Sequence, residues 1–104
     1  MQTLFLIDSV TGNIVGEPVK LDRNRQNMPG NMPMQIRGIV TATVQLQSTL
    51  DTDLKVRDGT AIWTPIANGT YTADVCDSLF VAFPYIRAVV TGYSSGTISV
   101  LIDR

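Results

Sequence analysis

The chain has 104 residues, of which 44% are hydrophobic, and its eight Lys and Arg nearly balance nine Asp and Glu for a net charge of −1. This charge argues against non-specific binding to nucleic acid or to an anionic membrane. The chain contains no histidine, which is the commonest general base and transition-metal ligand. We therefore expect a single domain over 1–104 that is not an enzyme and holds no cofactor or metal.

The N-terminal third predicts short strands followed by a polar loop. Thr3–Ile7 is an apolar run typical of a strand, and the residues after it have turn chemistry. Pro18–Leu21 predicts a short partner strand, with its proline at the first position. Asp22–Pro33 is polar, contains two prolines and shows no periodicity, so we expect a long loop or arm that joins no sheet.

A long alternating stretch from Met34 to Leu50 is the strongest signal in the chain. Apolar residues fall on the even-numbered positions, and Thr and Gln on most of the odd-numbered ones. This period of two predicts a strand with one face on a core and the other in water. The stretch is longer than the usual strand of about 3–10 residues, so we expect a bend or bulge near Gly38 that splits it.

The middle of the chain predicts shorter strands joined by turns. Asp51–Gly59 reads as a polar connection, and Thr60–Thr64 as a strand that places Trp63, the single tryptophan, in the core. Asn68-Gly69 is a strong signal for a two-residue turn. Further short strands are expected at 70–73 and 79–82.

The C-terminal region alternates twice. Tyr85–Thr91 and Thr97–Asp103 each show period two, and the Gly-containing connection between them predicts a terminal antiparallel hairpin. No window shows the periodicity of a helix. The fold class predicted is therefore all-β, an antiparallel β-sandwich or jelly roll of seven to nine short strands.

Few residues suggest a metal-binding or catalytic site. Asp51, Asp53 and Asp58 could form a calcium loop, but Lys55 stands where a further oxygen ligand is required, which favours a solvated turn. Cys76 is the single cysteine and has no histidine to activate it, so we expect a small, partly buried apolar side chain.

The polar loop is better suited to a protein contact than to nucleic acid. Arg23 and Arg25 have no neighbouring aromatic residues on which bases could stack, whereas Met28 and Met32 are adaptable apolar side chains of the kind enriched in interfaces. Arg87 lies on the non-core face of its predicted strand. These residues are the predicted partner-interface candidates, and no nucleic acid or membrane is expected to bind.

The order of these features resembles that of small virion proteins of tailed bacteriophages. The shared features are a short N-terminal strand, a Pro-Val pair, an alternating run with a Ser- and Asp-rich turn, a Trp-containing strand and a C-terminal hairpin. In this chain they are Thr3–Ile7, Pro18-Val19, Ala42–Leu46, Ser48–Asp53, Ile62–Thr64, Pro84–Val90 and Gly96–Val100. The longer Asp51–Gly59 connection and the Arg23–Pro33 loop depart from the pattern.

The resemblance implies a non-enzymatic structural protein, most specifically a capsid decoration (cement) protein. It implies capsid or other virion proteins as partners, a homo-oligomer (dimer or trimer), and assembly in the host bacterial cytoplasm; the absence of a signal-peptide pattern fits this location. The alternative is a carbohydrate-binding or adhesion module on a tail or fibre. Convergence of Tyr71, Tyr85 and Tyr93 on one concave face would favour that alternative.

Overall fold

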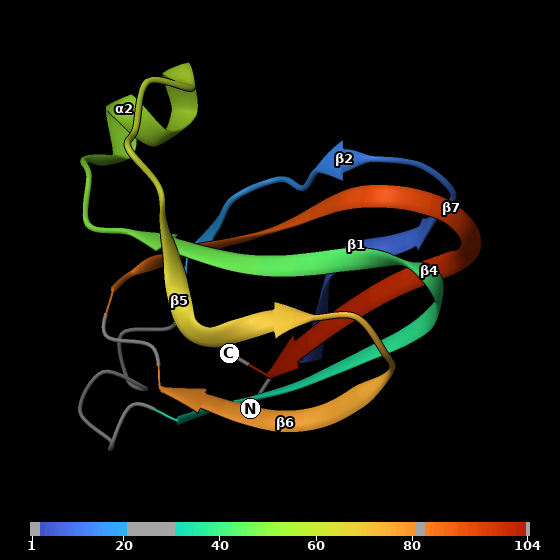
Figure 1. The fold of residues 1–104 in the computed structure, drawn as a ribbon. Helices are drawn as coiled ribbons and strands as arrows, with labels where there is room; N and C mark the ends of the chain where they lie inside the picture. Colours follow the sequence, from blue (N-terminus) through green and yellow to red (C-terminus); the bar gives the residue numbers. More distant parts are fainter. Residues whose placement is uncertain (1–2, 21–30, 81–82, 104) are drawn as a thin grey trace.

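The computed structural model describes residues 3–20, 31–80 and 83–103. Its strands form one antiparallel sheet of seven strands, which confirms the all-β prediction (Figure 1). The elements are β1 (Thr3–Val10), β2 (Ile14–Val15), β3 (Val19–Lys20), β4 (Asn31–Thr49), α2 (Asp53–Asp58), β5 (Thr64–Tyr71), β6 (Val75–Phe80) and β7 (Tyr85–Asp103).

Two long strands, β4 and β7, organise the whole sheet. Each has 19 residues, and they pair antiparallel from Met34 opposite Ile102 to Thr49 opposite Tyr85. The shorter strands add to their flanks, with β1, β2 and β3 on β7 and with β5 and β6 on β4. The predicted C-terminal hairpin is therefore wrong, because both alternating runs belong to one strand and both pair with β4.

Both long strands bend where glycines meet. Gly38 in β4 has φ +86° and Gly96 in β7 has φ +115°, values that side chains with a Cβ rarely adopt. A Cβ on Gly38 would overlap the carbonyl oxygen of Thr97, so the two backbones touch at this point. The β4–β7 register shifts on either side of Ile39, which confirms the predicted bulge near Gly38, although β4 remains one strand.

The bend folds the sheet so that its two halves face each other (Figure 1). One half contains β1, β6, the start of β4 and the end of β7; the other contains β2, β3, β5 and the remaining parts of the long strands. The finer prediction of a sandwich or jelly roll is not confirmed, because the strands belong to a single folded sheet.

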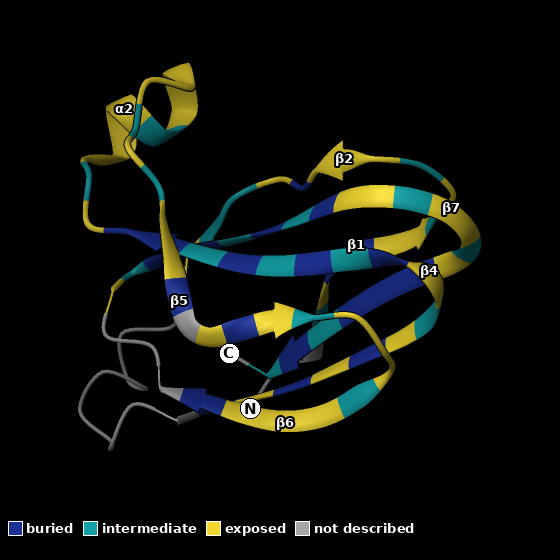
Figure 2. Cartoon of the chain, viewed as in Figure 1, coloured by how far each residue is buried: buried dark blue, intermediate teal, exposed yellow. Residues whose placement is uncertain are grey.

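The core lies between the two halves and follows the predicted alternation (Figure 2). Val40 and Leu50 are exceptions at 70% and 71% exposed, because one lies at the bend and the other follows the end of β4. The long strands contribute to the core cluster Met32, Met34, Ile36, Ala42, Val44, Leu46, Ile86, Ala88, Val90, Ile98, Val100 and Ile102.

The end of the predicted polar arm belongs to the sheet. β4 begins at Asn31, and Pro33 pairs with Ser78 of β6, so the expectation that this segment joins no ladder is wrong for 31–33. Pairing of β4 with β7 begins at Met34, one residue later. A proline without an N–H is tolerated at such an end of a ladder. The rest of the arm lies outside the described residues.

Two local predictions in the middle of the chain are also corrected. Asn68-Gly69 makes no hairpin turn but lies inside β5, where Asn68 has φ +61°. The β4–β5 register jumps from Gln45 opposite Thr70 to Gln47 opposite Pro65, so β5 advances five residues where β4 advances two and bulges out between these pairs. The polar connection contains the helix α2, which the sequence did not predict. Within the described ranges, no helix is long and apolar enough to cross a membrane.

Candidate partner-binding surface

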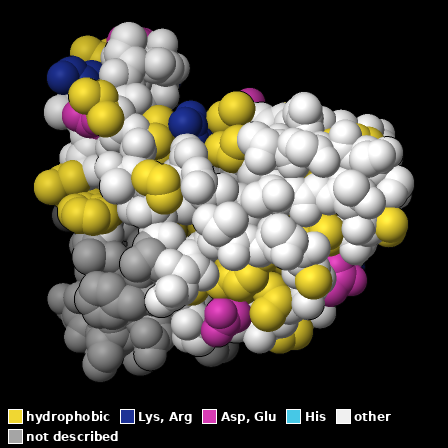
Figure 3. All heavy atoms as spheres, viewed as in Figure 1, with side chains coloured by type: hydrophobic (Ala, Val, Ile, Leu, Met, Phe, Trp, Pro, Cys, Tyr) yellow, Lys and Arg dark blue, Asp and Glu magenta, His cyan; other side chains and the backbone are white. Residues whose placement is uncertain are grey.

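The segment between β4 and β5 leaves the sheet and carries α2 at its tip. Thr52 caps the start, with its hydroxyl accepting from the Lys55 amide at 3.3 Å, and Gly59 ends the helix in the left-handed conformation. These two capping residues are the sequence signal that could have predicted α2. The helix has six residues, buries none of them and stands off from the sheet (Figures 1 and 3). Its stability therefore comes from its caps and from contacts at its base.

The base of this excursion is held by hydrogen bonds across its two ends. The Thr49 hydroxyl donates to the Ile62 carbonyl at 2.9 Å, and the Ile62 amide donates to the Asp51 carboxylate at 2.7 Å. The Tyr85 hydroxyl donates to the Asp53 carboxylate, and this hydrogen bond lowers the pKa of Asp53 and raises that of Tyr85. These aspartates therefore anchor the helix to the sheet.

No metal site forms from these carboxylates. Among the described residues, no group of three or more His, Cys, Asp and Glu side chains could hold a metal ion.

Lys20 completes the contacts that hold α2 to the sheet, with its Nζ 3.7 Å from the Asp53 Oδ1 and 5.7 Å from the centre of the Tyr85 ring. The negative charge of the Asp53 carboxylate is therefore balanced by a cation from β3.

Beside this base lies a surface depression of about 450 Å³, here called the apolar hollow. Leu50 and Ile62 are 71% and 80% exposed, and Phe83 is 42% exposed. In Figure 3, hydrophobic side chains gather at the left edge of the molecule, below the protruding helix. The lining residues are Ser48, Thr49, Leu50, Asp51, Ile62, Thr64 and Phe83. Large apolar side chains thus surround a depression that also has polar groups.

Trp63 lies next to the hollow but not in the core, which corrects the prediction for this residue. It precedes β5 and is partly exposed. The Arg87 guanidinium lies over its ring at 4.5 Å from the centre, and the Arg87 Nε donates to the Gln47 side chain at 2.8 Å. Partial burial lowers the pKa of Arg87. The indole thus packs against a cation on the outer face of the sheet.

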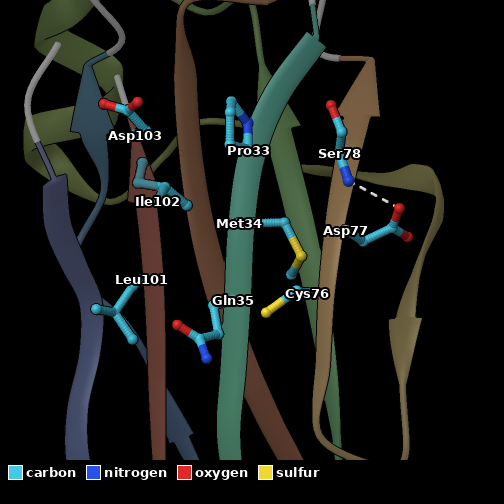
Figure 4. Close-up of a pocket in the computed structure, with 9 residues that line it drawn as sticks. All are labelled: Pro33, Met34, Gln35, Cys76, Asp77, Ser78, Leu101, Ile102 and Asp103. Atoms are coloured by element: carbon cyan, nitrogen blue, oxygen red, sulfur yellow. Dashed lines mark hydrogen bonds between the residues drawn. The ribbon is translucent and has the colours of Figure 1, made fainter.

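A second depression, here called the sheet groove, crosses the outer face of β7, β4 and β6 (Figure 4). Its volume is about 580 Å³. Cys76 lies here and is exposed, contrary to the expectation of partial burial. The Oδ1 atom of Asp103 is buried and has no hydrogen-bond partner among the described residues. The lining residues are Pro33, Met34, Gln35, Cys76, Asp77, Ser78, Leu101, Ile102 and Asp103.

The predicted interface residues differ in where they lie and in how far they are buried. Met32 is completely buried in the core, so its assignment to an interface is wrong: the alternation that begins at Met34 extends back to it. Arg87 is partly exposed on the outer face of the sheet, on the side opposite the core. Arg23, Arg25 and Met28 lie outside the described residues.

The tyrosines do not form a common platform. Tyr71 and Tyr93 are partly buried against the core, and their hydroxyls donate to Asp77 and to the Gly96 carbonyl. Tyr85 is only 9% exposed. The arrangement that would favour a carbohydrate site is therefore not present among these three residues.

Comparisons with protein-family models, with curated proteins and with solved structures found no match for this chain.

Proposed function

We propose that this chain is a non-enzymatic structural protein that acts by binding other proteins. The observation that carries the proposal is the apolar hollow. Leu50, Ile62 and Phe83 are large apolar side chains left in contact with water around one depression. Full burial of such a side chain contributes about 1.5–3 kcal/mol, so a partner that covers the hollow gains binding energy there. Contiguous exposed apolar surface bordered by polar groups is typical of protein-interaction sites.

The proposal in its most specific form is a capsid decoration protein of a tailed bacteriophage. The order of sequence features from Thr3–Ile7 to Gly96–Val100 supports this form through its resemblance to small virion proteins. Such a protein acts by mass action, because a subunit that binds the assembled shell but not the free shell protein stabilises the assembly.

Co-sedimentation with empty shells tests the proposal. The shells are assembled from a major capsid protein of a tailed bacteriophage, and the chain is added in increasing amounts. The test variant carries Leu50→Glu and Ile62→Glu in the hollow. Val40→Glu is the matched control, because Val40 is 70% exposed at the bend and outside the hollow.

We expect the parent and the control to sediment with the shells, and the hollow variant to remain in solution. Failure of the parent to sediment would overturn the decoration role. Equal binding by the hollow variant would show that another surface makes the contact. Binding of the parent to a glycan array, without binding to shells, would favour the carbohydrate-binding alternative.

A further inference from the structure

Outward-facing side chains of β4 and β7 form a hydrogen-bonded row of Arg87, Gln47 and Gln45, here called the polar row. Gln47 lies opposite Arg87 in the β4–β7 register, and Gln45 precedes it on the same face of β4. The Arg87 Nε donates to the Gln47 Oε1 at 2.8 Å, and the Gln47 Nε2 donates to the Gln45 Oε1 at 2.8 Å. Each of these side chains is partly exposed, so the polar row is accessible from outside.

Arg87 fixes the direction of the hydrogen bonds in the polar row, because an arginine side chain donates and never accepts. Gln47 must turn its amide oxygen toward Arg87, its Nε2 then points to Gln45, and Gln45 must accept with its own oxygen. Both amide oxygens are therefore already used. The Arg87 Nη atoms and the Gln45 Nε2 donate to no other described residue. The polar row thus presents unused donors and one positive charge to solvent.

The Arg87 guanidinium is held in place before any ligand arrives. It lies over the Trp63 ring at 4.5 Å from the centre, and its Nε is bonded to Gln47. Arg37, on the other half of the sheet, is exposed, lies 5.9 Å from the centre of the Phe5 ring and makes no side-chain hydrogen bond to a described residue. A side chain that is already ordered loses less conformational entropy on binding. Arg87 is therefore better prepared than Arg37 to bind a ligand.

The described carboxylates leave the charge of Arg87 unbalanced. An ion pair joins Lys20 to Asp53, and none among the described residues involves Arg87. Glu17 lies between β2 and β3, which both pair with this part of β7, yet it makes no ion pair with Arg87. Partial burial lowers the pKa of Arg87, because desolvation disfavours its charged form. An anion beside the guanidinium would offset that cost.

We propose that the polar row binds a carboxylate group, supplied by an Asp or Glu side chain of the protein partner. The carboxylate oxygens accept from the Arg87 Nη atoms, and the Gln45 Nε2 offers a further donor in the row. A carboxylate carries one charge and two oxygens in a plane, which match one planar guanidinium. A phosphate carries additional charge at neutral pH, for which the polar row has no second cation.

The source of the carboxylate rests on the proposed function. Gln47 and Trp63 directly precede Ser48 and Thr64, which are paired with each other and line the apolar hollow. Successive residues of a strand point to opposite faces, so the polar row and the hollow lie on the two sides of the same strand ends. A partner that covers the hollow and continues around these ends can place an acidic side chain on Arg87.

Titration of the isolated chain with sodium acetate, replacing chloride at constant ionic strength, tests the site without a partner. The ¹⁵N NMR signals of the Arg87 Nε–H and the Trp63 indole N–H report binding. We expect both to shift and to saturate on the order of 10–100 mM acetate, as for one charge-assisted pair. The Arg37 Nε–H is the internal control and should not shift, and phosphate should shift the Arg87 signal less than acetate does.

The titration has outcomes that would overturn the carboxylate site. They are an Arg87 signal that does not respond to acetate, an Arg37 signal that shifts as much as that of Arg87, and a larger response to phosphate than to acetate. The titration uses the unaltered chain, so it decides even where an Arg87 variant does not fold.

Co-sedimentation with the capsid shells tests the source of the carboxylate. Arg87→Gln should weaken binding at least about tenfold at low salt, and the difference from the parent should shrink at high salt, because salt screens the charge pair. Arg87→Lys keeps the charge but loses the planar fork of donors, so it should also bind more weakly than the parent. Arg37→Gln is the matched control, with the same change in net charge as Arg87→Gln, and should bind like the parent.

The two experiments separate this inference from the proposed function. Equal binding by folded Arg87→Gln and by the parent would overturn the assignment of the carboxylate to the partner. A parent that does not sediment with the shells would overturn the decoration role and this source of the carboxylate together. The acetate titration would then still decide whether the polar row is a carboxylate site.

Discussion

Substitution of Gly38 by alanine tests whether the contact between the two long backbones determines the shape of the sheet. Gly38 has φ +86°, and the added Cβ would overlap the Thr97 carbonyl oxygen. A backbone carbonyl cannot rotate away as a side chain can, so the bend itself must open. Opening it separates the β4 and β7 backbones at the point where the two halves of the sheet begin to face each other.

The expected loss of stability has two parts. A residue with a Cβ in the left-handed region costs about 1–2 kcal/mol, and overpacking adds about 1–3 kcal/mol. Gly92 is the matched control, because it also lies in β7 with positive φ (+61°) but has no atom within 4 Å of an added Cβ. Gly92→Ala should therefore show the conformational part alone.

Urea denaturation and thermal denaturation, both followed by circular dichroism, measure both variants against the parent. We expect Gly38→Ala to lose clearly more stability than Gly92→Ala, and its melting temperature to fall by roughly 4–8 °C for each kcal/mol lost. Equal losses in the two variants would mean that the close approach at the bend contributes nothing. The reasoning about the folded sheet would then be refuted.

Three further predictions test single side chains. Met32→Ala should cost about 2–5 kcal/mol in urea denaturation as a core truncation, whereas Gln35→Ala on the exposed face of β4 should change stability by less than about 0.5 kcal/mol. A double-mutant cycle of Trp63→Ala and Arg87→Ala should give a coupling of about 0.5–1 kcal/mol, and a coupling of zero would contradict the stacking. Burial and a neighbouring carboxylate raise the pKa of Tyr71 to about 12, above its value of about 10 in the unfolded chain. The stability that this residue contributes is present below pH 10 and is lost as the pH rises through about 12. The free energy of unfolding, measured by denaturation at alkaline pH, should therefore depend less on pH in Tyr71→Phe than in the parent.

Local patterns predicted the strands and their buried faces better than they predicted the partners of the strands. Alternation identified the inward residues of both long strands, such as Val44 and Val100, because a period of two is a property of each segment alone. Pairing of Tyr85–Asp103 with β4 could not be read from Gly92–Gly96, since the same glycines permit a tight turn or a bend. Whether this segment turns back or only bends depends on Gly38, which is more than 50 residues away in the sequence. Gly38 makes the bend in β4 that lies opposite this segment of β7.

The candidate surfaces were harder to predict because they depend on what the fold leaves uncovered. Trp63 follows an apolar residue and looks like core in the sequence, yet it lies outside the sheet against Arg87. Leu50 continues the parity of β4 but follows its last residue, so it is exposed. Such exposure is decided by where a strand ends, which is the least certain part of any sequence pattern.

The pairing of β4 with β7 also determines how the sheet can form. Among the described residues, every other strand hydrogen-bonds to one of these two. Until β7 has paired with β4, the strands β1, β2 and β3 have no partner, and β4 exposes its apolar face. Because the decisive contacts join segments that are distant in the sequence, folding should be slow for a domain of this size. Before that pairing the exposed face of β4 would make the chain a substrate for chaperones and proteases, and the pairing itself lets both halves of the sheet close in a single event.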